Sequence, residues 1–155
     1  MLVYLGLGSN LGNREEFLNL ARMALPNNGN LTILRESRII KTAPYGNTDQ
    51  PEFLNQVLEL ETSLSPLAML TLIREIEKSA GRQRNEKWGA RTLDIDILFW
   101  GDEIINREEL IIPHPDLHNR HFVLESLDEL NPELLHPILK KTVNELYKTL
   151  CGGKN

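Results

Sequence analysis

The chain of 155 residues is 41% hydrophobic and 25% charged, which is typical of one globular domain, here residues 1–155, with a core of its own. Its formal net charge of -5 argues against a general nucleic-acid binder, its single cysteine excludes an internal disulfide, and no apolar run approaches the roughly 20 residues that span a bilayer. The N-terminus lacks the charged region and cleavage site of a signal peptide, so we expect a cytoplasmic protein. We also expect a monomer with no nucleic-acid or membrane partner.

The first half of the chain reads as alternating strands and helices. In chain order we predict a strand at 2–7, a glycine-rich turn at 8–13, a helix at 14–25, strands at 31–42 and 53–62, and a helix at 66–80. Asn13 is the expected N-cap of the first helix, and Ser65 with Pro66 begins the second. The loop of residues 43–52 is polar and punctuated by proline and glycine, and its length is typical of a functional loop.

The second half begins with a strand and ends mostly in helix. We predict a strand at 93–99, a hairpin turn at 101–103, an edge segment ending at 111–113, and a helical tail at 120–150 with breaks near 131–132 and 136–137. The order strand, helix, strand, strand, helix, strand predicts an α+β fold. Its core would be a ferredoxin-like split βαβ arrangement, an antiparallel sheet with helices on one face, followed by a C-terminal extension.

The most informative stretch is residues 88–99, which read WGARTLDIDILF. Its apolar residues alternate with Asp94 and Asp96, the period-2 pattern of a half-buried strand, so both carboxylates share one face about 6–7 Å apart. Because like charges that close repel each other, we expect a cation between them. Magnesium prefers carboxylate and phosphate oxygens, and two Mg²⁺ ions here would clamp the oxygens of a phosphoryl transfer. The alternative is a pair of acids that blunts a solvent-facing strand edge.

A basic segment precedes this strand and stands out against the acidic chain. Its cations are Arg82, Arg84, Lys87 and Arg91. Arginine binds phosphate bidentately and keeps its charge, so these residues together with the aspartates indicate metal-phosphate binding. A solvated charged loop is the alternative, but Trp88 lies in the same segment, and an indole usually packs against something.

Two further patterns indicate a binding site. The run from Gly6 to Gly12 follows a strand and precedes a helix, but it has neither the dinucleotide nor the P-loop spacing, so we expect it to serve strand-to-helix packing beside the active face. Aromatic and amide side chains could form a slot for a flat, polar heterocycle, namely Tyr45, Phe53, Asn55 and Phe122. The alternative is that each aromatic ring belongs to the core.

Residues 113–121 hold most of the histidines. A zinc site is conceivable, but no cysteine pair supports it and the spacing fits no common pattern. We favour phosphate contact by His114 and Arg120, with the remaining histidines at the surface or internally satisfied. No serine, cysteine or threonine stands in a recognisable nucleophile context, so covalent hydrolase chemistry is not indicated.

Together these segments resemble the 6-hydroxymethyl-7,8-dihydropterin pyrophosphokinase family. The matching motifs are LGLGSNLGNR at 5–14, TAPYG at 42–46, PEFLN at 51–55, WGARTLDIDIL at 88–98 and PHPDLHNRHFVL at 113–124. The last two are the specific ones. The resemblance implies transfer of the pyrophosphoryl group of ATP to the hydroxymethyl group of 6-hydroxymethyl-7,8-dihydropterin, with release of AMP, in folate biosynthesis.

The resemblance also implies roles for particular residues. The catalytic residues would be Arg82, Arg91, Asp94 and Asp96, and the two aspartates would bind two Mg²⁺ ions. The pterin would contact Thr42, Ala43, Tyr45, Phe53, Asn55, Trp88 and Phe122. ATP would contact Glu77, Arg84, Lys87, Arg91, Ile97, His114 and Arg120.

A few positions depart from the family's pattern. Phe53 stands where tyrosine is frequent, Lys87 stands where arginine is frequent, and Pro115 follows His114 where an aromatic contact can occur. None of these changes involves the two aspartates. Two other classes remain open: a nucleotide-binding module without catalysis, and a metal-dependent phosphohydrolase that uses water as the acceptor.

Overall fold

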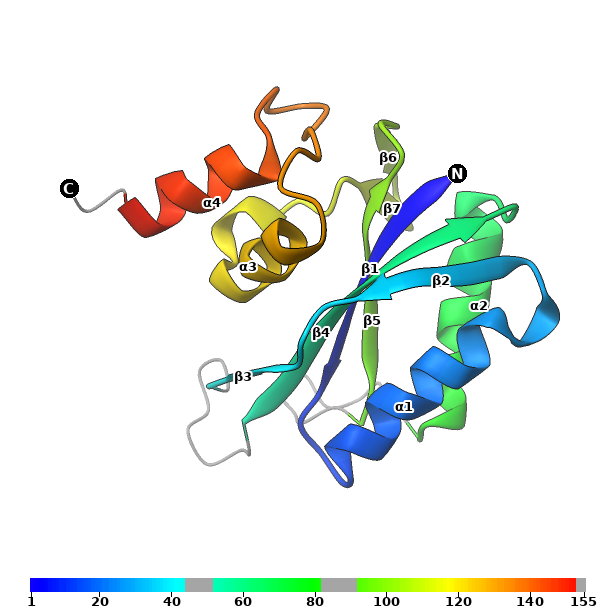
Figure 1. Cartoon of the computed structure of the whole chain (residues 1–155). Helices are drawn as coiled ribbons and strands as arrows, with labels where there is room; N and C mark the ends of the chain where they lie inside the picture. Colours follow the sequence, from blue (N-terminus) through cyan, green and yellow to red (C-terminus); the bar gives the residue numbers. More distant parts are fainter. Residues whose placement is uncertain (44–51, 82–91, 153–155) are drawn as a thin grey trace.

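The computed structural model describes residues 1–43, 52–81 and 92–152 (Figure 1). Its elements in chain order are β1 (Leu2–Ser9), α1 (Arg14–Ala24), the 3-10 helix η1 (Leu25–Asn28), β2 (Leu31–Glu36), β3 (Ile40–Thr42), β4 (Phe53–Thr62), α2 (Pro66–Ser79), β5 (Asp94–Trp100), β6 (Ile105–Arg107), β7 (Leu110–Ile112), the 3-10 helix η2 (Leu117–Asn119), α3 (His121–Leu130) and α4 (Val143–Gly152). Within these ranges, no helix is long and apolar enough to cross a membrane.

The main sheet has five strands in the order β2-β4-β1-β5, with β3 also paired to β4. Every one of these pairings is antiparallel. The units β1-α1-β2 and β4-α2-β5 interleave, because β4 lies between β1 and β2 and β1 lies between β4 and β5. The predicted α+β class with an antiparallel sheet is therefore confirmed, and β1, which carries the glycine-rich run, is central.

The first two helices begin where their capping residues predict. The Asn13 side chain accepts a hydrogen bond of 3.2 Å from the backbone N–H of Glu16, and the Ser65 hydroxyl accepts one of 3.2 Å from that of Ala68. Each bond satisfies an N–H that has no partner within its helix. Pro66 occupies the first position of α2, where its missing N–H is not needed.

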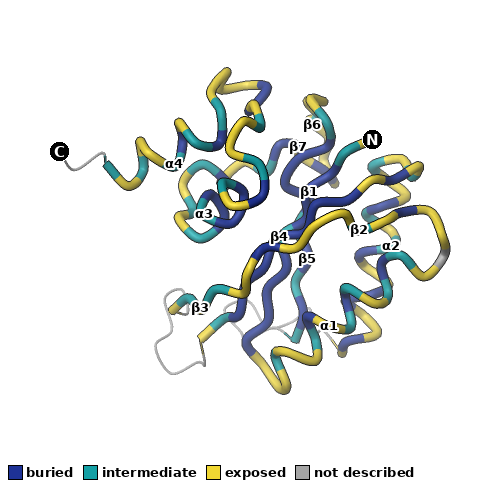
Figure 2. The backbone as a smooth tube through the Cα atoms, in the orientation of Figure 1, coloured by how far each residue is buried: buried dark blue, intermediate teal, exposed yellow. Residues whose placement is uncertain are grey.

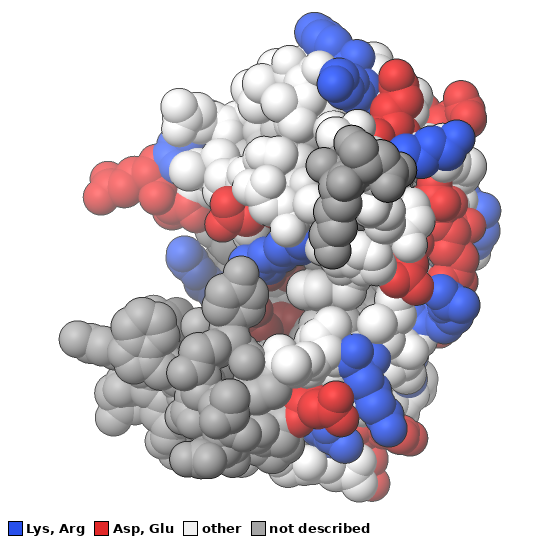
Figure 3. Space-filling model, turned by 90° about the vertical axis from the view of Figure 1, so that its left-hand side faces the viewer, with Lys and Arg blue, Asp and Glu red and all other residues white. Residues whose placement is uncertain are grey.

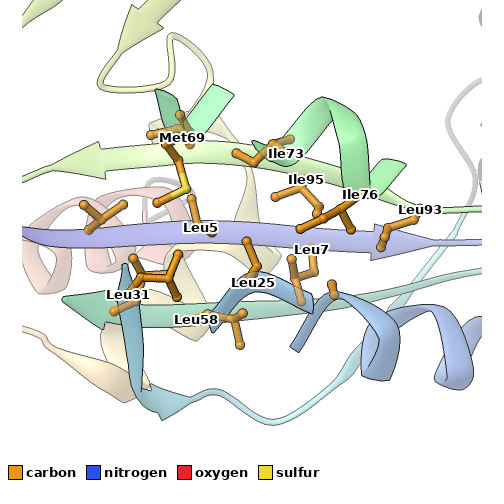
Figure 4. Close-up of a cluster of buried hydrophobic side chains, with 14 of the residues drawn as sticks. Leu5, Leu7, Leu25, Leu31, Leu58, Met69, Ile73, Ile76, Leu93 and Ile95 are labelled. Carbon is orange, nitrogen blue, oxygen red and sulfur yellow. The ribbon is translucent and has the colours of Figure 1, made fainter. Parts of the chain in front are cut away.

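One face of the sheet packs against α1 and α2. Leu5, Leu7 and Ile95 point from β1 and β5 toward Met69 and Ile73 of α2, and all are buried in one hydrophobic cluster (Figure 4). Figure 2 shows how the buried strands run through the centre of the molecule with the exposed helix faces outside them. This face matches the expectation that helices cover the sheet.

The opposite face of the sheet is covered by the predicted C-terminal extension, whose position on the sheet the sequence did not predict. Tyr4, Val57 and Phe99 form a second buried cluster with Leu124 of α3 and Val143 of α4. Both helices lie on the side away from α1 and α2 (Figure 1). The physical reason is that β4 is buried along nearly its whole length, so the side chains on both of its faces need apolar neighbours.

The predicted strand at 31–42 is wrong as a single element, because it breaks into β2 and β3. Ser37 lies in the break, where its N–H donates to the carbonyl of Val57 and its hydroxyl accepts from the N–H of Val57, each at 2.9 Å. Its own carbonyl accepts a bond of 2.7 Å from the Gln56 side chain. These side-chain bonds replace the regular ladder at this point.

The hairpin also differs from the prediction. Gly101, with φ of 54°, turns the chain after β5, but this turn does not reverse it onto the main sheet. Instead β6 pairs with β7 in a separate two-stranded sheet, and the tight turn lies between Arg107 and Leu110. The chain then returns to β5, because the N–H of His114 donates a 3.1 Å bond to the carbonyl of Leu98.

Candidate active site

Asp94 and Asp96 project from the same face of β5. Ile95 and Ile97, between and after them, are buried in the cluster with α2, so the two aspartates lie on the face that α3 and α4 cover elsewhere. Across the sheet, Asp94 is opposite Gly8 of β1, so a residue without a side chain stands beside this carboxylate. The shared face predicted from the period-2 pattern is present.

A cation lies close to Asp96 on this face. Figure 3 shows both acidic and basic side chains reaching a recess of the molecule. The Asp96 side chain is 36% exposed and Arg120, at the start of α3, is 38% exposed, with Nη1 of Arg120 3.9 Å from Oδ2 of Asp96. An ion pair of this length between half-exposed groups is weak, so the guanidinium can turn toward an anion without a large loss.

Glu77 contacts the backbone of the strand that carries the aspartates. Its side chain is buried near the end of α2, and its Oε2 accepts a 2.8 Å hydrogen bond from the backbone N–H of Ile95. Because β5 is an edge strand, this N–H would otherwise point away from the sheet without a ladder partner. Glu77 thus holds the backbone between Asp94 and Asp96 in place.

His114 is anchored next to the same strand. Its Nδ1 accepts a 3.2 Å hydrogen bond from the backbone N–H of Asp116, which leaves Nε2 as the protonated nitrogen of the neutral ring. Burial lowers the pKa of His114, and the positive charge of Arg120 lowers it further, while Asp116 and Asp94 act in the opposite direction. His114 and Arg120 therefore lie near the aspartates, as the sequence led us to expect.

Asn55, on β4, presents its side-chain oxygen to this face. Its amide nitrogen donates to the carbonyl of Ile40 at 3.2 Å and to the hydroxyl of Thr42 at 2.7 Å. Both amide hydrogens are thereby engaged, and Oδ1 lies toward Gly8, 3.4 Å from where a Cβ on that residue would stand. Asn55 consequently offers an acceptor, whereas the sequence alone left both donor and acceptor open.

The remaining predicted contacts are spread around this face. The Phe53 ring lies next to Gly8, with Cδ1 3.8 Å from the same Cβ position. Phe122 is half-buried at the start of α3, and Ala43 is exposed directly after β3. The side chain of Ile97 is buried in the core against α2, so only its backbone is available to a nucleotide.

Several predicted site residues cannot be placed. Tyr45, Arg82, Arg84, Lys87, Trp88 and Arg91 lie outside the described residues. In the ranges that the structure does describe, no group of three or more histidine, cysteine, aspartate or glutamate side chains could hold a metal ion. The zinc alternative considered for residues 113–121 therefore finds no support there, and Asp94 and Asp96 do not form such a group by themselves among the described residues.

Sequence reasoning missed the position of Gly8 in this site. The register places it opposite Asp94 on β5 and opposite Asn55 on β4, so the three residues form one row across the sheet. The sequence pattern alone favours strand-to-helix packing as the role of the glycine-rich run. A glycine in the interior of a strand was the available signal, because such a residue marks a close approach.

Comparison with known proteins is consistent with this geometry. Residues 4–132 match the family described as 7,8-dihydro-6-hydroxymethylpterin-pyrophosphokinase (HPPK). A 2-amino-4-hydroxy-6-hydroxymethyldihydropteridine pyrophosphokinase of Haemophilus influenzae is 42% identical over 151 residues, which cover 97% of this chain and 94% of that protein. The protein of the same name from Aquifex aeolicus is 41% identical over 143 residues, which cover 92% and 88%.

Solved structures share the fold at lower sequence identity. An HPPK-DHPS in complex with substrates has a TM-score of 0.75 at 16% identity, over 99% of this chain and 44% of that one. A Plasmodium falciparum HPPK-DHPS with pterin and p-hydroxybenzoate has a TM-score of 0.76 at 18% identity, over 98% and 43%. The chain thus spans less than half the length of these solved chains. With the match over residues 4–132 and the relatives above 40% identity, the chain belongs to the 7,8-dihydro-6-hydroxymethylpterin-pyrophosphokinase family.

Proposed function

We propose that this chain transfers the pyrophosphoryl group of ATP to the hydroxymethyl oxygen of 6-hydroxymethyl-7,8-dihydropterin and releases AMP, as a step of folate biosynthesis. The observation that carries the proposal is the row formed by Asp94, Gly8 and Asn55 across three strands. It sets a pair of carboxylates beside an amide that suits a heterocycle, in a chain whose relatives are named for this reaction.

Asp94 and Asp96 are the proposed ligands of Mg²⁺. The fit rests on the donor set, since Mg²⁺ usually takes one or two carboxylates from the protein and completes its coordination with water and substrate phosphates. Two carboxylates on one face of a strand, with a glycine opposite Asp94, leave room for this arrangement. The bound metal would supply neutralisation of charge on the phosphate oxygens.

The residues around the aspartates would position the triphosphate. Arg120 can offer its guanidinium to a phosphate, because its pairing with Asp96 at 3.9 Å is loose. His114 can donate from Nε2, since its Nδ1 is occupied as an acceptor. Phosphoryl transfer needs mainly positioning and neutralisation of charge, which these donors provide.

The pterin would bind at the other end of the row. Oδ1 of Asn55 would accept from an N–H of the heterocycle, and the Phe53 ring, which lies beside the same glycine, would stack on it. The hydroxymethyl oxygen then attacks the β-phosphorus of ATP. The new bond joins that oxygen to the β-phosphorus, the bond from the β-phosphorus to the α,β-bridging oxygen breaks, the bridging oxygen leaves with AMP, and the hydroxyl proton is released.

A product assay tests this proposal. The purified chain is incubated with ATP, Mg²⁺ and 6-hydroxymethyl-7,8-dihydropterin, and the nucleotides are separated. We expect AMP in a one-to-one ratio with pyrophosphorylated pterin, dependent on the pterin, abolished by EDTA and restored by Mg²⁺. Formation of ADP, or release of phosphate without pterin, would overturn the proposal in favour of another kinase or a phosphohydrolase. ATP binding without any AMP would indicate a nucleotide-binding module.

A further inference from the structure

Gly8 occupies the middle of the row that joins the two ends of the candidate site. On one side it is opposite Asp94, and on the other side it is opposite Asn55. Neighbouring strands are about 4.8 Å apart, so the row from Asp94 to Asn55 spans about 10 Å. A flat bicyclic ring anchored at Asn55, with its one-carbon substituent directed at the aspartates, has to pass over Gly8.

The backbone does not require glycine at this position. The described glycines with positive φ are Gly12, Gly29, Gly81 and Gly101, and Gly8 is not among them. Its conformation is therefore open to an ordinary residue, which would also stabilise the strand relative to glycine. The reason for glycine at position 8 has to be space rather than conformation.

The space above Gly8 borders the side chains assigned to the pterin. A Cβ added there would stand 3.4 Å from Oδ1 of Asn55 and 3.8 Å from Cδ1 of Phe53. Both distances are ordinary van der Waals contact, so an alanine fits the chain without ligand. The methyl group would nonetheless occupy the volume between the acceptor oxygen and the stacking ring.

Gly6, two residues earlier on the same face, has different surroundings. The three atoms nearest to a Cβ on Gly6 all belong to the side chain of Leu98, at 3.5–3.6 Å. On the β5 side Gly6 is opposite Asp96, as Gly8 is opposite Asp94, but on the β4 side it is opposite Val57 of the hydrophobic cluster rather than Asn55. Gly6 therefore serves as a matched comparison with the same residue type on the same strand and face.

We propose that Gly8 is a specificity-determining residue, whose missing side chain forms the floor on which the pterin ring lies between Asn55 and the aspartates. This inference rests on the proposed function for the identity of the heterocycle. It assigns to Gly8 a larger effect on the pterin than on ATP, because the side-chain atoms nearest to a Cβ at this position belong to Asn55 and Phe53.

The test compares Gly8→Ala with Gly6→Ala and the wild type. We expect Gly8→Ala to unfold at or above the wild-type temperature, to raise the KM for the pterin by about tenfold or more, and to leave the KM for ATP within about twofold, because overpacking acts only where the ring lies. Gly6→Ala should keep the pterin KM within about threefold. A Gly8→Ala pterin KM within about threefold of wild type, or an equal rise in both KM values, would overturn the inference.

A binding titration separates this inference from the proposed reaction. The intrinsic fluorescence of 6-hydroxymethylpterin reports its binding to each variant without turnover. Weaker pterin binding by Gly8→Ala than by Gly6→Ala supports the inference even if the wild type forms no AMP, a result that would contradict the proposed function alone. Equal pterin binding by the two variants overturns the role of Gly8 whatever the products are.

Discussion

Oε2 of Glu77 accepts a 2.8 Å hydrogen bond from the backbone N–H of Ile95, the residue between Asp94 and Asp96. The bond joins α2 to the edge strand of the sheet and is buried. The family resemblance implies that Glu77 contacts the nucleotide, and that role stays a prediction. What the structure shows is that Glu77 fixes the strand that carries the two aspartates.

Glu77→Leu tests this role. The substitution removes the acceptor of a buried N–H, so we expect the free energy of unfolding to fall by about 1–3 kcal/mol and turnover to fall with it. Glu77→Gln retains an acceptor oxygen and should recover most of the stability. Urea unfolding and steady-state kinetics measure both effects. Glu75→Leu, at an exposed position of the same helix, is the control, and an equal loss of stability in it would contradict the assignment.

Asn55→Asp tests the orientation of the amide. Its nitrogen donates to the carbonyl of Ile40 and to the hydroxyl of Thr42, whereas an ionised aspartate can donate to neither and can only accept from that hydroxyl. The carboxylate would also carry a charge in a nearly buried position. We expect the KM for the pterin to rise by about tenfold or more with little change in the KM for ATP, since a hydrogen-bonded polar site discriminates strongly. Similar rises in both values would speak for a general loss of structure.

His114 makes stability depend on pH. Burial, and then Arg120, lowers its pKa in the folded chain below the ordinary value of 6.5. The unfolded chain therefore binds more protons as the pH falls through 6.5, so this contribution to stability is fully present above pH 6.5 and is lost progressively below it. We expect His114→Gln to flatten part of the decline in unfolding free energy between about pH 7 and 5. An unchanged pH profile would contradict this.

Tyr4 links the sheet to the C-terminal part of the chain. Its hydroxyl donates to Glu59 and accepts a 3.1 Å bond from Asn131, while Arg35 pairs with Glu59 at 2.9 Å. Tyr4→Phe removes two of these bonds, so we expect a loss of about 1–3 kcal/mol in unfolding free energy with unchanged KM values. A large rise in either KM would show that the cluster reaches the site.

The raised pKa of Tyr4 also predicts that the free energy of unfolding declines at high pH. Burial, and then the hydrogen bond to Glu59, raises the pKa of Tyr4 to about 12, against 10.0 for the free side chain. A raised folded-state pKa contributes stability that is complete below pH 10.0 and disappears as the pH rises toward about 12. The free energy of unfolding, measured across this pH range, should decline less steeply in Tyr4→Phe than in the wild type.

Local signals predicted the parts of the fold that depend on local chemistry. Asn13 and Ser65 mark the starts of α1 and α2 because each caps its helix by a bond three residues away. The break at Ser37 could not be predicted, because it depends on bonds to Val57, 20 residues later. The second covered face escaped prediction for a similar reason, since α3 and α4 pack on residues that are distant in the sequence.

The candidate site also combines features that are visible in the sequence with features that depend on tertiary packing. The shared face of Asp94 and Asp96 follows from the period of a strand, and period is visible in the sequence. The bond from Glu77 to Ile95 and the place of Gly8 between Asp94 and Asn55 depend on packing and register across strands. The alternating pattern fixes which face of a strand is buried, but it does not identify the partner residue on a strand that is distant in the sequence.

The carboxylates of Asp94 and Asp96 are the centre of the proposed reaction, and their conservative removal tests it most directly. AMP formation from ATP and the pterin is measured for Asp94→Asn, Asp96→Asn and the control Asp102→Asn, an exposed aspartate in the turn after β5. We predict a loss of about 100-fold or more in kcat for the first two, with unchanged unfolding temperature, and wild-type turnover for the control. Near-normal AMP formation by Asp96→Asn would contradict the assignment of the metal site to this strand.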